Sequence, residues 1–231
     1  METASLKIIF KPETLAAASM ENQFLPASLT IQRFTGAALN DHLEDVARLR
    51  IEVFRDFPYL YDGTMDYERK YLQTYVRCPQ AVVVVAFADG EVVGASTAIP
   101  LQFEEANFRK PFTDNGYDPA EVFYCAESVL RQDYRGKGLG VRCFEEREAH
   151  ARSLGDFRYY AFCSVVRPPE HPLRPAGYQP LDRFWQQRGY QKHPELRASY
   201  SWKDIDQPHE TSKQLEFWLK SIRTSTSDQS S

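Results

Sequence analysis

The chain has 231 residues, enough for one well-filled domain with extensions, and 42% of them are hydrophobic. That hydrophobic content excludes a chain that is disordered throughout. The formal net charge of -4 at pH 7 argues against a general nucleic-acid-binding protein, because neutralising phosphates needs an excess of clustered Lys and Arg.

The first regular elements are expected after an N-terminal extension of residues 1–28. Residues 29–34 alternate apolar and polar side chains, as a half-buried strand does. Apolar residues then recur at helical spacing across 39–54, with Asn40 or Asp41 as the expected N-cap. The chain therefore begins its folded part with a strand followed by a helix.

A hairpin is the clearest local pattern in the chain, and a second helix over residues 65–75 leads into it. Residues 81–88 and 91–99 are rich in valine and alanine. They are joined by Asp89-Gly90, a dipeptide typical of tight hairpin turns. We therefore expect two neighbouring antiparallel strands here.

The second half of the chain alternates strands with helices. Residues 122–130 predict a buried strand, and residues 138–154 predict a helix that ends at Gly155. The elements expected after it are a strand over 159–166, a helix over 180–188, a strand over 198–202, a helical extension over 206–223 and a disordered tail over 224–231. This order predicts a mixed α+β fold, with a central, mostly antiparallel sheet flanked by helices.

The segment 135–140 reads Arg-Gly-Lys-Gly-Leu-Gly and lies between the strand and the helix. Its glycines allow backbone amides to approach an anion closely, and the helix N-terminus adds a partial positive charge. Arg135 and Lys137 supply full charges, so we expect a pyrophosphate ligand. A Walker loop would need Gly-Lys-Ser/Thr, and a dinucleotide fingerprint would need its third glycine one residue later.

Two segments resemble the GNAT superfamily of N-acetyltransferases. Residues 132–140 resemble its motif A, Arg/Gln-x-x-Gly-x-Gly/Ala after the fourth core strand. Residues 184–190, Phe-Trp-Gln-Gln-Arg-Gly-Tyr, resemble the end of the family's last helix and strand. The resemblance covers 29–202, and it implies a GNAT domain over 29–205 with acetyl-CoA as co-substrate and no metal.

The resemblance also implies which residues hold acetyl-CoA. Backbone groups of Ser128, Val129 and Leu130 would hold the pantetheine arm as a strand edge does, with the Leu130 amide polarising the thioester carbonyl. The pyrophosphate would be held beside Arg135 by backbone amides of Gly136, Lys137, Gly138, Leu139, Gly140 and Val141.

Direct transfer from a thioester to an amine requires a base for the ammonium. Glu127 lies in an otherwise apolar strand beside the expected thioester site, and Glu121 at the start of that strand is a second candidate. A buried carboxylate is costly unless it is paired or functional, which favours Glu127. An ion pair of Glu127 with Arg131 or Arg167 is the structural alternative.

Many family members carry a tyrosine that protonates the CoA thiolate, and Trp185 occupies that position here. The tryptophan side chain cannot donate a proton to the thiolate in this way. Tyr178 is therefore a candidate donor, with Tyr190, Ser164 or a water molecule as alternatives, unless the thiolate leaves unaided.

The acceptor site is expected in two loops. The resemblance places the segment 56–62 over the acceptor, where Asp56 would attract a cationic amine and Tyr59 and Tyr61 would stack on it or hydrogen-bond to it. His171, in a proline-rich loop, would line the same side. Alternatively, these aromatic side chains only pack the helices together, and the proline-rich loop is structural.

The four cysteines, Cys78, Cys125, Cys143 and Cys163, are widely spaced, without a CxxC pair, so we expect reduced and mostly buried thiols. The sequence shows no secretory signal and no apolar run of membrane-spanning length, which favours a cytoplasmic protein.

The combined prediction is an acetyl-CoA-dependent N-acetyltransferase that acts on a small primary amine. No nucleic-acid or membrane partner is expected, and homodimerisation is a family expectation. One alternative is a GNAT-like acyl-CoA sensor or scaffold without turnover, supported by the absent tyrosine. Another is a protein lysine or N-terminal acetyltransferase, which would need an open acceptor groove.

Overall fold

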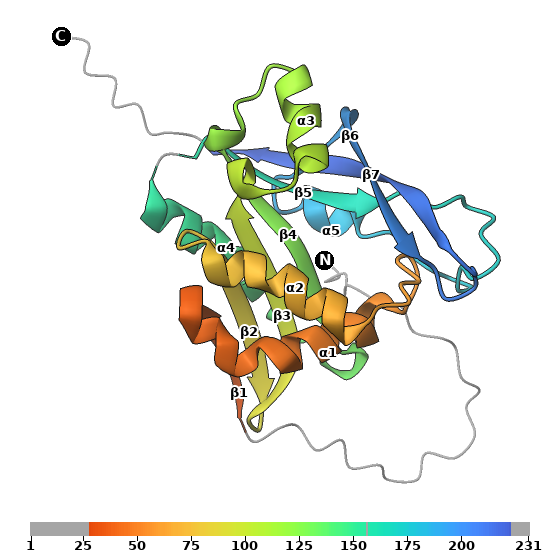
Figure 1. Ribbon diagram of the computed structural model, residues 1–231, viewed down its shortest axis with the longest axis horizontal. Coiled ribbons are helices and arrows are strands. Elements are labelled where there is room, and N and C mark those ends of the chain that lie inside the picture. The colour runs from red at the N-terminus through yellow and green to blue at the C-terminus, as the bar shows by residue number, and fades with distance from the viewer. Residues whose placement is uncertain (1–27, 156, 223–231) are drawn as a thin grey trace, which may run out of the picture.

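A seven-stranded sheet runs through the centre of the computed structural model, which describes residues 28–155 and 157–222 (Figure 1). Its order is β1-β2-β3-β4-β5-β7-β6, and the pairs are antiparallel except for β4 with β5. The strands are β1 (Leu29–Phe34), β2 (Val82–Ala88), β3 (Glu91–Pro100), β4 (Val122–Leu130), β5 (Tyr159–Val165), β6 (Gln191–Lys203) and β7 (Glu210–Ser221). The predicted mixed α+β class with a mostly antiparallel sheet is confirmed.

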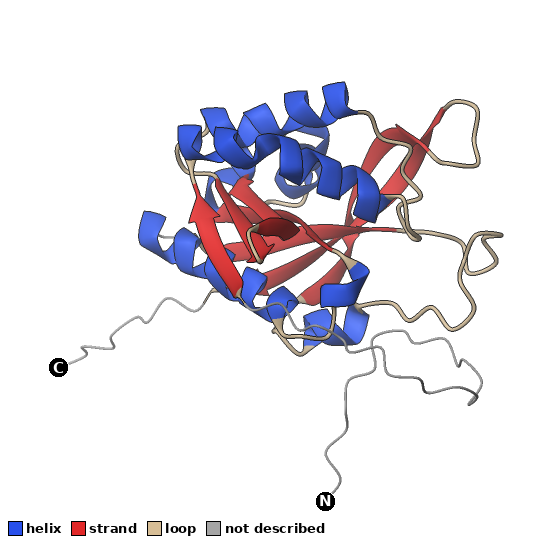
Figure 2. Ribbon diagram, turned by 90° about the horizontal axis from the view of Figure 1, so that it is seen from below, coloured by secondary structure: helices blue, strands red, loops and turns tan. Residues whose placement is uncertain are grey.

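Helices cover both faces of this sheet (Figure 2). The helices α1 (Leu43–Phe54) and α2 (Met65–Arg77) pack on one face, and α4 (Leu139–Leu154) packs on the other. The short α5 (Asp182–Gln186) lies on the α4 side, because its aromatic side chains join the same apolar cluster. The predicted helices over 39–54, 65–75, 138–154 and 180–188 therefore exist, with shifted ends.

The sheet buries apolar side chains on both faces, as β2 shows. Val83 and Val85 belong to the cluster under α1 and α2, whereas Val82 and Val84 belong to the cluster under α4. Alternate side chains of a strand point to opposite faces, so a strand covered on both sides reads as an uninterrupted apolar run. The predicted hairpin is confirmed, and its turn residues Asp89 and Gly90 both have positive φ.

The prediction of a helical extension over 206–223 is wrong. Residues 210–221 form β7, which inserts between β5 and β6, so the sheet extends past the domain end predicted at residue 205. The missed signal is a period of two: Lys213, Leu215, Phe217 and Leu219 are all buried. The predicted tail over 224–231, and the predicted extension over 1–28 apart from Ser28, lie outside the described residues.

Two local predictions also need correction. Asn40 and Asp41 do not cap α1, because both lie within a 3-10 helix, η1 (Gly36–His42), that precedes it. The helix α3 (Ala106–Asp114) was not expected from the sequence, since it is short and carries Pro111 in its interior. It packs against β6, which places it over one end of the sheet.

Candidate active site

The strands β4 and β5 run side by side for only three residues and then separate. Their parallel pairing begins at Val122 and Tyr159 and ends at Tyr124 and Ala161. On its other side β4 stays paired with β3 as far as Leu130. Among the described residues, the second half of β4 therefore has no strand partner on this edge, which faces a gap in the sheet.

The direction of the β4 amides follows from one hydrogen bond. The Arg131 amide donates to the Val93 carbonyl of β3 at 3.0 Å. Successive residues of a strand direct their backbone groups to opposite sides, so the amides of Ser128 and Leu130 point away from β3, into the gap. These two of the three predicted pantetheine residues thus offer the free strand edge that an extended ligand can pair with, while Val129 faces β3.

A β-bulge marks the place where β4 leaves β5. Thr97 of β3 pairs with Glu127 and Ile99 pairs with Tyr124, so β4 carries one extra residue here. Arg147 of α4, only 1% exposed, donates to the carbonyls of Thr97 at 3.4 Å and Glu127 at 3.0 Å. This buried guanidinium satisfies carbonyls at the bulge and links α4 to the gap.

The glycine-rich turn follows β4 and leads directly into α4. Gly136 and Gly138 have φ of 75° and 82°, in the left-handed region that glycine adopts without strain. Arg142 is the first residue of α4 to donate a helical bond, to the Gly138 carbonyl. Within the described chain, the amides of 139–141 have no protein acceptor, as in the first turn of any helix without a side-chain cap. Such a turn fits an anion.

The predicted cofactor residues around this turn differ in what they can offer. Arg135 Nε donates to the Leu130 carbonyl at 3.1 Å, and its guanidinium lies 3.8 Å from the carboxylate of Asp56. Lys137 Nζ is exposed above the Tyr134 ring. The Leu139 side chain is buried in the core, so only its backbone is available to a ligand.

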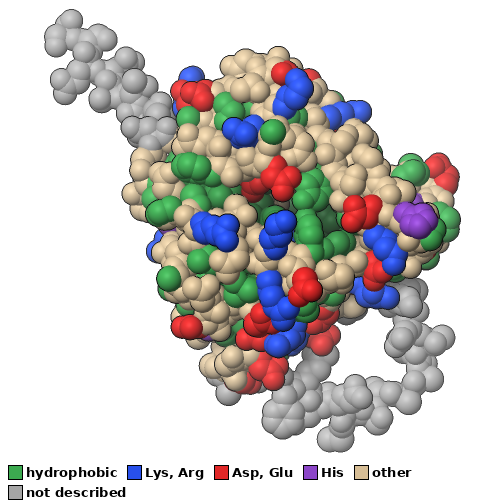
Figure 3. All heavy atoms as spheres, viewed as in Figure 1, with side chains coloured by type: hydrophobic (Ala, Val, Ile, Leu, Met, Phe, Trp, Pro, Cys, Tyr) green, Lys and Arg blue, Asp and Glu red, His purple; other side chains and the backbone are tan. Residues whose placement is uncertain are grey.

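A pocket of about 120 Å³ opens on the α1–α2 face of the sheet, beside the gap. Figure 3 shows a hollow lined by hydrophobic side chains, with acidic side chains next to it. Ala126 of β4 and Cys163 of β5 line it from the two separating strands, and Glu104, Glu105 and Glu127 also line it. Its aromatic walls are Phe54, Tyr59, Tyr61, Tyr67, Tyr71, Phe108, Tyr124, Tyr200 and Trp202.

The tyrosines of the pocket are neutral hydrogen-bond donors at neutral pH, because burial raises the pKa of each. This holds for Tyr124, whose hydroxyl lies 3.0 Å from Cys163 Sγ where β4 and β5 part. Burial also raises the pKa of the Cys163 thiol to about 12, so it is not a thiolate nucleophile at neutral pH. Burial likewise raises the pKa of the other pocket tyrosines, which are Tyr59, Tyr61, Tyr67, Tyr71 and Tyr200.

Glu127, the candidate base on the central strand, lines the pocket and is held by an ion pair. Arg50 of α1 contacts both Glu127 and the fully buried Glu68 of α2. Thr97 Oγ1 donates to the Glu127 carboxylate at 3.2 Å, and the Tyr71 hydroxyl donates to it at 3.4 Å. Neither arginine expected from the sequence pairs with it: Arg131 pairs with Glu52, and Arg167 pairs with Asp204.

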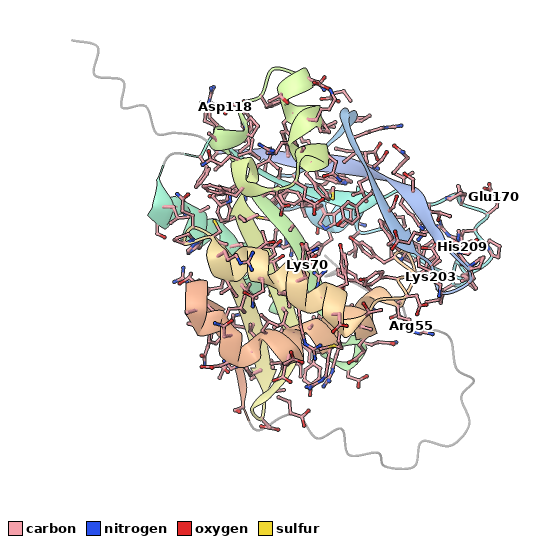
Figure 4. All side chains as sticks on the ribbon, viewed as in Figure 1. Arg55, Lys70, Asp118, Glu170, Lys203 and His209 are labelled. Carbon is pink, nitrogen blue, oxygen red and sulfur yellow. The ribbon has the colours of Figure 1, made fainter. Side chains whose placement is uncertain are left out.

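Glu121, the second candidate base, does not reach the pocket. It forms a solvent-exposed ion pair with Arg158 at 3.2 Å, at the start of β4. In Figure 4, Asp118 of the same turn lies at the opposite edge of the molecule from Lys203. Lys203 is paired with Asp62, and their chain neighbours Trp202 and Tyr61 line the pocket. The prediction of a catalytic Glu121 is therefore not supported by its position.

Three further predicted residues also lie outside the pocket lining. The rings of Tyr178 and His171 stand against Phe57, with centroids 4.7 and 5.9 Å away. Asp56 is exposed beside Arg135 at the glycine-rich turn and does not line the pocket. The roles expected of Tyr178, His171 and Asp56 are therefore not supported by their positions.

Tyr59 and Tyr61 line the pocket, and their segment is tied to the C-terminal strands. The Tyr59 carbonyl accepts hydrogen bonds from Trp202 Nε1 at 3.0 Å and from Arg167 at 2.6 Å. Tyr61 forms an isolated bridge with Asp204, just beyond β6. The segment after α1 and the β6–β7 hairpin therefore close one end of the pocket together.

Residues 41–174 match the model of the acetyltransferase (GNAT) family. The chain belongs to the GNAT acetyltransferase family. This confirms the resemblance seen in the glycine-rich segment, which lies within the matched range. No curated protein matches the sequence.

Solved structures show the same fold as this GNAT protein. An N-acetyltransferase from Staphylococcus aureus Mu50 is similar with a TM-score of 0.55 and 12% identity, covering 85% of this chain and 100% of that one. A ribosomal-protein-alanine N-acetyltransferase from Brucella melitensis gives 0.54 and 13%, covering 84% and 99%. YncA from Salmonella typhimurium, a putative acetyltransferase solved with acetyl-CoA, gives 0.53 and 12%, covering 87% and 99%.

Sequence reasoning missed most of the pocket wall of this GNAT domain. Tyr67 and Tyr71 are four residues apart on α2, and Tyr200 and Trp202 are two apart on β6, so each pair shares one face. Those spacings were a usable signal. No such sequence signal marked Glu104, because it lies in the connection between β3 and α3, where no periodicity indicates an inward-facing side chain.

Two further properties concern the described residues alone. In those ranges, no group of His, Cys, Asp and Glu side chains is arranged to hold a metal ion. None of the helices there has the length and apolar character needed to cross a membrane.

Proposed function

We propose that this GNAT protein transfers the acetyl group of acetyl-CoA directly to the primary amine of a small molecule bound in the aromatic pocket. The observation that carries the proposal is that the pocket meets the gap between β4 and β5. Ala126 and Cys163, on the two separating strands, both line the pocket. A thioester lying along β4 and an amine in the pocket would meet there.

The acetyl-CoA side of the proposal is supported by the free backbone groups. The Ser128 and Leu130 amides face the gap, where the pantetheine arm would pair with β4, and the Leu130 amide would polarise the thioester carbonyl. The backbone amides of 136–141, together with the charged side chains of Arg135 and Lys137, would hold the pyrophosphate. The left-handed Gly136 and Gly138 leave this turn open, since a Cβ added at either glycine would have no neighbouring atom within 4 Å.

The closed end of the pocket favours a small acceptor over a polypeptide. An internal lysine of a polypeptide is best reached along a groove that is open at both ends, and here the Ile205 amide donates to the Leu60 carbonyl at 2.7 Å across one end. The aromatic walls and the carboxylates of Glu104 and Glu105 suit a cation that carries an apolar body. The protein-acetylating alternative is therefore disfavoured.

The pocket also contains proton donors that do not depend on the tyrosine absent at Trp185. Trp185 packs in the core on the α4 side, 5.0 Å from the Trp218 ring, and cannot serve. Tyr124, a neutral phenol at the gap, is positioned to donate a proton toward a departing thiolate. Turnover is thus favoured over a sensor that only binds acetyl-CoA.

The test is calorimetric titration with acetyl-CoA, followed by a CoA-release assay with matched panels of small amines and lysine peptides. Release with a small amine, and none with peptides, supports the proposal. Tyr67→Ala, at the pocket wall, should raise the KM for the amine, whereas Phe103→Ala, similarly exposed and outside the pocket, should not. A folded protein that does not bind acetyl-CoA would refute the proposal.

A further inference from the structure

Three carboxylates line the acceptor pocket, and their surroundings differ. Glu127 is occupied by Arg50 and by the hydroxyls of Thr97 and Tyr71. A carboxylate held by a guanidinium is stabilised in its charged form and is a poor proton acceptor. Glu105 is exposed at the start of α3, where water competes for its charge.

Glu104 is the third carboxylate, and no basic side chain of the described residues neutralises it. It follows the 3-10 helix η2 (Leu101–Phe103), is half-buried, and lines the pocket. Its carboxylate accepts a hydrogen bond from the Glu105 amide at 3.3 Å. Within residues 28–155 and 157–222, no Lys, Arg or His lies within ion-pair distance of it.

Arg50 of α1, the one cation among the described residues that line the pocket, is paired with Glu68 and Glu127. The titratable groups that face Glu104 come from α2, β4, β5 and β6. They are phenols and a thiol, which stay neutral near neutral pH because burial raises their pKa, together with the neighbouring carboxylate of Glu105. By element these groups are Tyr71 and Tyr75 on α2, Tyr124 on β4, Cys163 on β5 and Tyr200 on β6. Glu104 is thus a carboxylate in an aromatic, weakly polar setting that opens toward the acceptor.

We propose that Glu104 is the catalytic base, which accepts the proton of the acceptor's ammonium group inside the pocket, while Glu127 positions Arg50 and the pocket floor. The inference rests on the proposed function, because it assigns the proton acceptor of that reaction. It replaces the expectation that the carboxylate on the central strand performs this step.

The proton transfer and the acyl transfer conserve atoms and charge. The Glu104 carboxylate takes one proton from R-NH3+, which leaves a neutral amine with a free electron pair. The amine nitrogen bonds to the thioester carbonyl carbon, and the C–S bond then breaks. Tyr124 donates its proton to the sulfur and takes the second proton from the nitrogen, so CoA departs as a thiol. Glu104 then releases its proton to solvent, which returns the carboxylate.

The protonation equilibrium of Glu104 is consistent with this role. Burial raises the pKa of Glu104 to about 7, and the charge of Glu105 acts in the same direction, against a weaker lowering by the Glu105 amide. A base whose pKa lies near the working pH both exists as a carboxylate and holds a proton effectively.

The first test needs no substrate and compares unfolding temperatures of wild type and Glu104→Gln between pH 5 and 8. Between pH 5 and about 7 the unfolded chain has already lost the Glu104 proton while most of the folded chain still holds it, so wild type loses stability as pH rises through that range. The Tm of Glu104→Gln relative to wild type should therefore increase from pH 5 to 8. A difference that stays constant between pH 5 and 8 would overturn the inference.

The second test measures kcat/KM for the amine found in the acceptor screen. Glu104→Gln should lower it about 100-fold at pH 7, leave the acetyl-CoA affinity unchanged, and abolish the rise of kcat with a midpoint near pH 7. The control Glu121→Gln should retain the wild-type profile. A Glu104→Gln variant as active as wild type would overturn this inference alone, whereas a wild-type protein that transfers acetyl to no amine would overturn the proposed function as well.

Discussion

Replacing Glu68 by Gln is expected to destabilise the fold through the buried ion pair that joins α1 and α2. Glu68 of α2 is 0% exposed, and its partner Arg50 of α1 is 5% exposed. Gln keeps the shape of Glu and can still accept a hydrogen bond. It carries no charge, so the buried guanidinium would be neutralised by Glu127 alone.

The expected loss follows from the burial of both partners. Removing one partner of a buried ion pair costs about 3–5 kcal/mol, because the remaining charge is left in a poorly solvating interior. Since Gln retains a polar contact and Glu127 retains a charge, we expect the lower end, about 3 kcal/mol. For a domain of this size that corresponds to a decrease in Tm of about 6–12 °C.

The assay is urea unfolding followed by tryptophan fluorescence, and the chain provides a matched control. Glu44 and Arg69 join the same two helices, but both side chains are 45% exposed. Solvent and salt screen such a pair, so Glu44→Gln should leave the unfolding free energy almost unchanged. If Glu68→Gln and Glu44→Gln have equal effects, burial is not what makes the Arg50 pair important, and the reasoning fails.

Two further variants test the turn and a second buried pair. Gly138→Ala and Gly116→Ala both force alanine into a left-handed conformation, which should lower the free energy of unfolding by about 1–2 kcal/mol each. Only Gly138→Ala should also lower the affinity for acetyl-CoA measured by calorimetry. Asp204 is buried, but hydrogen bonds from Arg167 and Lys213 outweigh that and lower its pKa. Asp204→Asn should therefore destabilise by about 3–5 kcal/mol at pH 7. The difference from wild type, measured by urea unfolding, should shrink as pH falls below about 4, where the unfolded chain binds the proton.

The cofactor side of the site was predictable because it is contiguous in the chain. A strand, a glycine-rich turn and a helix follow one another between residues 122 and 154, so local rules define how their backbone amides point. The positive φ of Gly136 and Gly138 is the conformation for which glycine is required. Family membership followed from the same short segment.

The ion pair of Glu127 was not predictable in the same way. A costly carboxylate in an apolar strand indicates that some partner exists, but many arginines in the chain could supply the charge. Arg50 is 77 positions away, and only the packing of α1 against β4 selects it. The half-buried position of Glu104 depends likewise on the packing of several elements around its loop.

The sequence by itself determined the strand order of the hairpin, the glycine-rich turn before α4 and the family, because each depends on neighbours within a few residues. Only the tertiary structure decided the acceptor pocket, which brings together α1, α2, β4, β5 and β6. It also decided that residues 210–221 form a strand between β5 and β6. A period of two becomes a strand only where two partners provide hydrogen bonds for its backbone, and those partners lie far away in the chain.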